Sequence, residues 1–261
     1  MTEFPSIPLE DLAEEAHKIL EDQKLVYDLA GKRLALRTVE LEAYLSQPEN
    51  TFRLAIVGPP NRSKTTYAYS VYSVLKKYDL STHYLDLDLY TESGLAISGM
   101  IDWAQRTKRT LEEVGEEKIL ESIKTFGNLK GGIVVGDFPG KIDDPYQTQR
   151  LKQTELAIIL AKDHEEIKEW SDLCSTLGVK YRWLISETEP PLKYEILYPS
   201  FYNLTRNVRF SPMILVSVTS ILEEIAAIRN ITLSNVGAHF SQPERVVLEE
   251  VLDFHFSIQN V

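Results

Sequence analysis

The chain has 261 residues and a formal net charge of −11 at pH 7, which disfavours nonspecific binding of nucleic acid over its whole surface. Hydrophobic residues make up 43% and charged residues 26%, as in soluble globular proteins, and the length suits one large α/β domain with or without appendages. Cys174 is the single cysteine, so an intramolecular disulfide and a cysteine-rich metal cluster are excluded. The sequence shows no basic and apolar leader and no apolar run of membrane-spanning length. We therefore expect a cytoplasmic protein without a membrane segment.

The N-terminal segment, residues 1–50, predicts a small appendage. Apolar side chains recur at helical spacing over residues 8–22. Residues 24–36 resemble a β-hairpin that turns near Gly31, and a short helix follows over residues 39–46. We therefore expect a helix–hairpin–helix appendage of small α/β type, and it carries no catalytic signature.

Strand and helix signals alternate from residue 51 onward, which predicts a three-layer α/β core with a mainly parallel sheet over residues 51–230. The expected strands cover residues 52–57, 82–88, 131–137, 156–161 and 180–185, and the expected helices include residues 64–77, 164–177 and 213–229. One or two further helices follow the second strand, where Thr110 and Glu113 predict a capping box. An irregular insertion occupies residues 187–212, and residues 231–261 predict a C-terminal helical extension.

A phosphate-binding signal follows the first strand of this core. The strand breaks at Gly58, and Lys64 and Thr65 open a helical pattern, which nearly matches the P-loop Gly-x4-Gly-Lys-Ser/Thr in its expected strand–loop–helix context. Such a loop directs backbone N–H groups, the positive end of a helix and a Lys ammonium at the phosphates of a nucleotide. The candidate phosphate-binding residues are Gly58, Pro59, Pro60, Asn61, Arg62, Ser63, Lys64, Thr65 and Thr66.

Ser63 stands where this pattern has its second glycine. Its Cβ opposes both the positive φ and the close approach of backbone to phosphate that glycine allows. The motif therefore predicts a nucleotide-phosphate site without guaranteeing an active NTPase. An ordinary turn between strand and helix with an exposed Lys64 is the alternative.

Asp137 ends an apolar strand, as the acidic residue of a Walker B motif does. Beside a P-loop, this position predicts that Asp137 and the Thr65 hydroxyl hold Mg²⁺. The alternative is that Asp137 only caps the following turn. Gly140 completes an Asp-x-x-Gly pattern, in which a backbone N–H can contact a terminal phosphate.

Two more carboxylates, Asp86 and Asp88, alternate with leucines at the end of the second expected strand, so both are expected on one strand face. A carboxylate there could accept the proton of a substrate hydroxyl, as in a small-molecule kinase. Polar residues at a strand end are an equally good interpretation. With Lys64, these two residues are the catalytic candidates. The Tyr-rich run at residues 193–202 is a candidate protein-binding patch or a lid.

Residues 52–230 resemble a P-loop NTPase core with an atypical Walker A loop, and the run from Asp137 to Gly140 is similar to the acid-x-x-Gly loop of its GTPase-like and kinase-like members. The guanine-selecting Asn-Lys-x-Asp motif is not found after the fourth strand, so the resemblance implies ATP, or another nucleotide, with Mg²⁺. A narrower resemblance is to the NTPase-like domain that accompanies a CRISPR-associated ring nuclease. It is carried by residues 56–60 and 132–140, among others, and implies an antiviral context.

Two functions compete on these observations. The first is an ATP-binding P-loop protein, a phosphotransferase or slow ATPase, centred on Lys64, Thr65 and Asp137. The second is a degenerate, non-catalytic P-loop module that serves as a regulatory or scaffold protein and binds a partner through its acidic surface and Tyr-rich insertion. Ser63 favours the second function, whereas the retained Lys, Thr and Asp favour the first.

Overall fold

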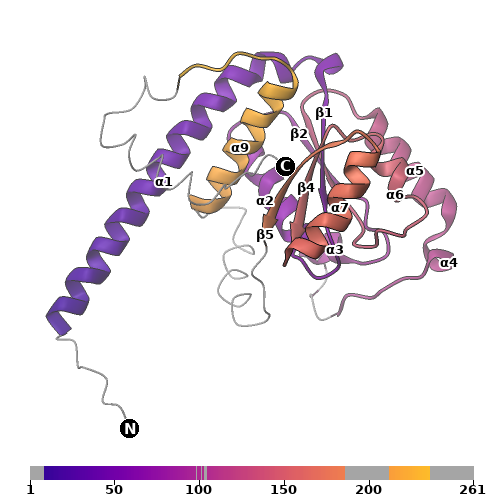
Figure 1. Cartoon of the computed structure of the whole chain (residues 1–261), viewed down its shortest axis with the longest axis horizontal. Coiled ribbons are helices and arrows are strands. Elements are labelled where there is room, and N and C mark those ends of the chain that lie inside the picture. Colours follow the sequence, from indigo (N-terminus) through magenta and orange to yellow (C-terminus); the bar gives the residue numbers. More distant parts are fainter. Residues whose placement is uncertain (1–8, 98, 101, 103–104, 186–211, 236–261) are drawn as a thin grey trace, which may run out of the picture. The chain divides into compact units, whose positions relative to one another are not determined.

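The computed structural model describes residues 9–97, 99–100, 102, 105–185 and 212–235 (Figure 1). The chain divides into two compact units between Arg37 and Thr38, and α9 (Pro212–Ile228) groups with the N-terminal residues. We call residues 9–37 and 212–235 the helical unit and residues 38–185 the sheet unit. This division differs from the expected one, which placed the last core helix with the sheet.

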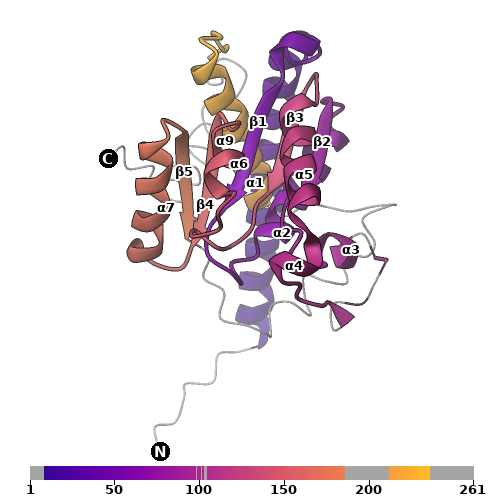
Figure 2. The same cartoon turned by 90° about the vertical axis from the view of Figure 1, so that its right-hand side faces the viewer.

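The sheet unit contains a five-stranded, all-parallel sheet with the strand order β2-β3-β1-β4-β5, which Figure 2 shows side by side. The strands are β1 (Phe52–Val57), β2 (Thr82–Asp86), β3 (Ile133–Asp137), β4 (Leu156–Ala161) and β5 (Lys180–Ile185). The predicted α/β fold with a parallel sheet is thereby confirmed. Strands β3 and β4 are buried along their whole length, as their continuous apolar sequences predict for strands that are covered on both faces.

Helices cover both faces of this sheet. They are α2 (Lys64–Lys77), α3 (Ser93–Ile97), α4 (Leu111–Val114), α5 (Glu116–Asn128), α6 (Gln147–Leu151) and α7 (His164–Thr176), and a 3-10 turn, η1 (Pro48–Asn50), precedes β1. The connection from β1 to β2 crosses the sheet in one direction, whereas the connections from β2 to β3, from β3 to β4 and from β4 to β5 all cross it in the opposite direction. Right-handed crossovers therefore place α2 on one face and α5, α6 and α7 on the other. Phe126, Leu151 and Trp170 from these three helices share one core cluster.

Local signals explain the ends of several elements. The capping box predicted at α4 is confirmed, because the Thr110 hydroxyl accepts from Glu113 N and the Glu113 carboxylate accepts from Thr110 N. Arg53 is the residue of β1 that is not buried, and its guanidinium donates to the carbonyls of Phe126 and Leu129, 3.0 and 3.2 Å away, at the end of α5. These bonds satisfy carbonyls that a helix end leaves unpaired.

The expected hairpin at residues 24–36 is wrong, because this segment is part of one long helix, α1 (Leu9–Leu45). The short helices expected on either side of it belong to the same helix. An isolated glycine such as Gly31 costs a helix only about 1 kcal/mol relative to alanine. Burial of Leu29 and Leu34 outweighs this cost in the folded protein. Local turn chemistry was therefore overridden by packing of an amphipathic helix.

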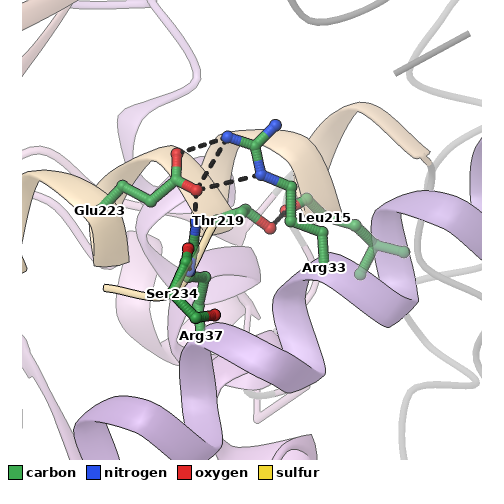
Figure 3. Close-up of polar contacts among 6 residues, drawn as sticks. All are labelled: Arg33, Arg37, Leu215, Thr219, Glu223 and Ser234. Carbon is green, nitrogen blue, oxygen red and sulfur yellow. Dashed lines mark hydrogen bonds and ion pairs between the residues drawn. The ribbon is translucent and has the colours of Figure 1, made fainter. Parts of the chain in front are cut away.

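The helical unit is joined by one carboxylate that two arginines share (Figure 3). Arg33 donates to both oxygens of Glu223, with Nη2 2.8 Å from each, and Arg37 Nε donates to Glu223 Oε1 at 2.8 Å. Arg37 also donates to the carbonyl of Ser234 at 3.1 Å. The arginines stand one turn apart on α1, so a single acidic residue of α9 fixes the register of the two helices. Around it, the α9 residues Leu215, Val218, Leu222 and Ile225 are fully buried.

The expected insertion at residues 187–212, with its Tyr-rich run, lies outside the described residues except for Pro212, which begins α9. The expected extension at residues 231–261 lies outside them from residue 236 onward. The predictions made for them stay predictions. Within the part of the chain that the structure describes, no helix is both long enough and apolar enough to cross a membrane.

Replacement of Glu223 by glutamine should destabilise the helical unit. The variant leaves two guanidinium groups without their shared counter-charge, so we expect a loss of about 1–3 kcal/mol in the free energy of unfolding. Urea unfolding followed by circular dichroism measures it, with Glu42→Gln, an exposed position on α1, as the control. Equal unfolding midpoints for the parent and Glu223→Gln would contradict the proposed role of this carboxylate.

Candidate nucleotide-phosphate site

The candidate site lies at the carboxyl edge of the parallel sheet. Strand β1 lies between β3 and β4, and its Ile56 pairs in register with Asp137 of β3. On the other side of β3, Asp86 of β2 pairs with the same Asp137. The loop after β1 and the ends of β2 and β3 therefore meet at one edge, which is where open parallel sheets bind ligands.

The loop between β1 and α2 has the strand–loop–helix arrangement that the P-loop pattern predicted. Gly58 has φ +134°, and a Cβ on it would lie 2.0 Å from the carbonyl oxygen of Leu160, so only glycine fits there. Asn61 and Ser63 both take positive φ angles, 61° and 57°. Ser63, with ψ 24°, is left-handed at the position where the P-loop pattern has glycine. The loop thus keeps a backbone shape suited to glycine although the glycine has been replaced.

Lys64 lies inside this site with only 7% of its surface exposed. Its ammonium donates a hydrogen bond to the carbonyl of Pro59 at 2.8 Å. A Cβ on Gly140 would lie 2.9 Å from Lys64 Nζ and 2.7 Å from Pro60 N, so the loop after β3 packs directly on the P-loop. Burial lowers the pKa of Lys64, and the carboxylates of Asp137 and Asp88 oppose that shift.

Asp137 is the most buried acid of the site, with 1% of its surface exposed. Neither of its carboxylate oxygens has a hydrogen-bond partner among the described residues. Burial raises the pKa of Asp137 to about 7, while the neighbouring Thr65 hydroxyl and the Lys64 ammonium act to lower it. A buried carboxylate without partners is costly unless something else neutralises it.

These groups fit Mg²⁺. The ion takes oxygen ligands, commonly one or two carboxylates completed by water and substrate phosphates, and Asp137 and Thr65 offer a carboxylate and a hydroxyl. Within the described ranges, no group of three or more acidic, His or Cys side chains could hold a metal by itself. An ion between Asp137 and Thr65 would therefore need oxygens from water or from a nucleotide.

The structure gives Asp86 and Asp88 different surroundings. Strand β2 ends at Asp86, so Asp88 lies beyond the expected strand. The Asp86 carboxylate accepts backbone N–H groups from Asp88 and Gly94, both at 3.0 Å, and so orders the loop that leads to α3. Burial raises the pKa of both acids, and for Asp88 the nearby Lys64 is the strongest opposing influence.

Arg62, a P-loop residue, is held by Glu166 of α7. Its Nε and Nη2 atoms lie 2.9 and 2.6 Å from the two Glu166 oxygens, and Glu166 also accepts the backbone N–H of Lys162. The ion pair raises the pKa of Arg62 and lowers that of Glu166 to about 2. A contact between Arg62 and phosphate would require this pair to separate.

Sequence reasoning missed a buried polar cluster that follows the Asp-x-x-Gly loop. Arg150 is fully buried, and its Nη1 lies 3.0 Å from Asp144 Oδ1. The other guanidinium nitrogens, Nε and Nη2, have no hydrogen-bond partner in the described part of the chain, and neither does the amide of the buried Gln147. Polar residues at a spacing of three near a turn are typical of an exposed segment. The sequence therefore gave no sign that Asp144, Gln147 and Arg150 are buried.

No protein-family model matches the chain, and no curated protein matches it significantly. Solved structures are similar to it at low TM-scores. A plasmid partition protein from Borrelia burgdorferi has a TM-score of 0.44 and 11% identity over 67% of this chain and 99% of that one. A DUF1611 family protein from Anabaena variabilis ATCC 29413 has a TM-score of 0.41 and 12% identity over 69% of this chain and 60% of that one. The septum site-determining protein MinD from Pyrococcus horikoshii OT3, complexed with Mg-ADP, has a TM-score of 0.40 and 14% identity over 81% of this chain and 100% of that one. With each of these TM-scores below 0.5, the likenesses do not show a function for this chain.

Proposed function

We propose that the chain binds the phosphates of a nucleoside triphosphate, ATP in the first place, together with Mg²⁺, at the loop between β1 and α2. One observation carries this proposal. The buried ammonium of Lys64 and the unpartnered carboxylate of Asp137 lie close together beside a loop in which Ser63, at the position of the second P-loop glycine, has a left-handed backbone. The preference for adenine rests on the sequence after β4, where the guanine-selecting motif is not found.

Each residue has a role in this proposal. Lys64 neutralises charge on the β- and γ-phosphates, and the backbone N–H groups at the start of α2 bind phosphate oxygens. Thr65 and Asp137 would hold Mg²⁺, which when bound supplies positive charge against the phosphates. The backbone N–H of Gly140, a residue packed against Pro60 and Lys64, would contact the terminal phosphate.

We also propose a reaction at this site, either transfer of the terminal phosphoryl group to an acceptor or slow hydrolysis of ATP. Asp88 is the better candidate base, because it influences the pKa of Lys64 and so lies near that ammonium. An acceptor hydroxyl or a water molecule between Asp88 and the terminal phosphate would lose its proton to this carboxylate.

A non-catalytic regulatory or scaffold module is the second candidate. The Cβ of Ser63 and the ion pair of Arg62 with Glu166 favour it, since both work against close phosphate contact. A protein partner bound through residues 193–202 belongs to this second candidate. The antiviral context rests on the narrower resemblance in the sequence and is independent of the choice between the two.

Lys64→Ala should abolish stabilisation by nucleotide. A ligand at 100 times its dissociation constant raises the free energy of unfolding by about 2.7 kcal/mol, and the variant loses this gain because it lacks the ammonium. Thermal-shift titration with Mg-ATP and Mg-GTP measures it. Lys76→Ala, an exposed position on the same helix, is the control. An unchanged response of the Lys64 variant would refute a phosphate site here.

Asp137→Asn should weaken nucleotide binding in Mg²⁺ more than binding in EDTA. The amide keeps the shape of the side chain but removes the negative charge that holds the ion. Calorimetric titrations with and without Mg²⁺ give the ratio of the two dissociation constants. Asp172→Asn, at an exposed position on α7, controls for the loss of one charge. The same ratio in the parent and in Asp137→Asn would exclude the metal-binding role.

Ser63→Gly separates the two candidate functions. Glycine removes the Cβ that opposes the approach of backbone to phosphate, so we expect tighter binding of Mg-ATP and faster hydrolysis if any occurs. Relief of left-handed strain and the larger entropy of the unfolded chain are each about 1 kcal/mol and act in opposite directions, so stability should change little. Asn61→Gly is the matched control: it also introduces a glycine at a position of the loop with positive φ, but asparagine, unlike serine, tolerates that conformation well. Absence of binding in both the parent and Ser63→Gly would favour the scaffold function.

A further inference from the structure

Tyr84 brings a buried hydroxyl group to the side of the site opposite the P-loop. It stands two residues before Asp86 on β2, so the two side chains lie on one face of the strand. Tyr84 pairs in register with Val135, and Asp86 pairs with Asp137. The phenol of Tyr84 therefore lies on the same face of the sheet as the Asp137 carboxylate, two residues nearer to the amino ends of the strands.

The hydroxyl of Tyr84 has no hydrogen-bond partner within the described ranges, although it is buried. Two carboxylates influence it: after burial, Asp137 and then Asp86 are the main causes that raise the pKa of Tyr84. The oxygens of Asp86 each accept a backbone N–H group, whereas those of Asp137 accept none. Asp137 is thus the acceptor with free positions for the phenol proton.

The ring of Tyr84 is fixed by two tyrosines of α2. Its centroid lies 5.7 Å from that of Tyr69, edge to face at 86°, and 5.9 Å from that of Tyr72. Such aromatic pairs are directional contacts that hold a ring in one orientation. The same helix begins with Lys64 and Thr65, so one rigid element positions both the phosphate-binding groups and the phenol.

We propose that Tyr84 is a positioning residue for the metal site: its hydroxyl donates a hydrogen bond to Asp137 and orients that carboxylate toward Mg²⁺. The inference rests on the proposed function. A carboxylate has more acceptor positions than one metal ion uses, and a donor on the remaining positions fixes its rotation and favours its ionised form. Tyr84 contacts neither nucleotide nor metal in this arrangement and acts through Asp137.

Tyr84→Phe tests this role because it removes one hydroxyl group and keeps the ring. We expect the Mg²⁺-dependent part of ATP binding to weaken by about 10–100-fold, the usual effect of removing a partner of a metal ligand. Binding of ATP in EDTA should not change. Calorimetry with Mg-ATP and with ATP in EDTA provides both values, and unfolding curves in urea establish that the variant is folded.

Tyr72→Phe is the matched control, since it belongs to the same ring cluster but its hydroxyl accepts from Lys76 Nζ, at 3.2 Å, in an exposed position. Equal losses in the two variants would show that ring packing matters and not the Tyr84 hydroxyl. In an Asp137→Asn background, Tyr84→Phe should have no further effect on Mg²⁺ dependence. A full additional loss there would overturn the inference.

ATP binding by the parent and by Tyr84→Phe distinguishes the role of Tyr84 from the presence of the metal site. Mg²⁺-dependent ATP binding that is equal in the parent and in Tyr84→Phe would overturn the role of Tyr84 alone. Absence of Mg²⁺-dependent binding in the parent would overturn both, because Asp137 would then hold no ion. Loss of binding in EDTA as well as in Mg²⁺ would place Tyr84 in the packing of the loop and would contradict a role through the metal.

Discussion

The candidate site depends on the parallel pairing of β1 with β3 and β4. This pairing brings the end of β1 beneath the carbonyl of Leu160 and beside the end of β3, and two glycines make both approaches possible. Gly58 has no room for a Cβ against β4, and Gly140 has none against Pro60. The P-loop and the Asp-x-x-Gly loop are therefore held in contact by backbone packing, before any side chain contributes. Substitution at Gly140 would move the two loops apart, and substitution at Gly58 would move the P-loop away from β4.

Charge within the site follows from this packing. Asp86, Asp88 and Asp137 lie close enough to influence one another; Lys64 opposes the rise in the pKa of Asp88 and Asp137, and the buried Arg150 also opposes that of Asp88. Burial disfavours the ionised form of every one of these groups. The three acids outnumber Lys64 and Arg150, the two cations that act on them, so the site has a deficit of positive charge when all three acids are ionised. Mg²⁺ brought with a nucleotide would reduce that deficit, which gives a physical reason for the metal in the proposed function.

Predictions from the sequence were accurate where the structure depends on residues that are neighbours in the sequence. The strands at residues 52–57, 156–161 and 180–185 were predicted to the residue. For residues 156–161 the reason is a continuous apolar run, which is typical of a parallel strand that is buried on both faces. The N-terminal hairpin was mispredicted, since the pair Ala30-Gly31 looks like a turn in the sequence and only tertiary packing makes it helical. The strand expected to include Asp88 ended two residues earlier, where the Asp86 carboxylate takes over hydrogen bonding of the backbone.

Contacts between residues that lie far apart in the sequence could not be predicted from local sequence patterns. Glu166 stands 104 positions after Arg62, and nothing near either residue indicates the partner. Tyr84 looked like an ordinary strand residue, and its position beside Asp137 follows only from the strand order and register. The sequence therefore located the candidate phosphate-binding loop and the acids near it, whereas the residues that contact them could be found only from the fold.

Strand β2 lies at one edge of the sheet, and all five of its residues are only half-buried. Strand β1, by contrast, has a hydrogen-bonded neighbour on each side. Opening of β2 by local fluctuation breaks one ladder and exposes little apolar surface, so it costs less free energy than opening of β1. In a hydrogen-exchange experiment, the amides of β2 would gain deuterium well before those of β1. The side of the candidate site that carries Tyr84 and Asp86 would therefore open more often than the side formed by β1 and the loop that follows it.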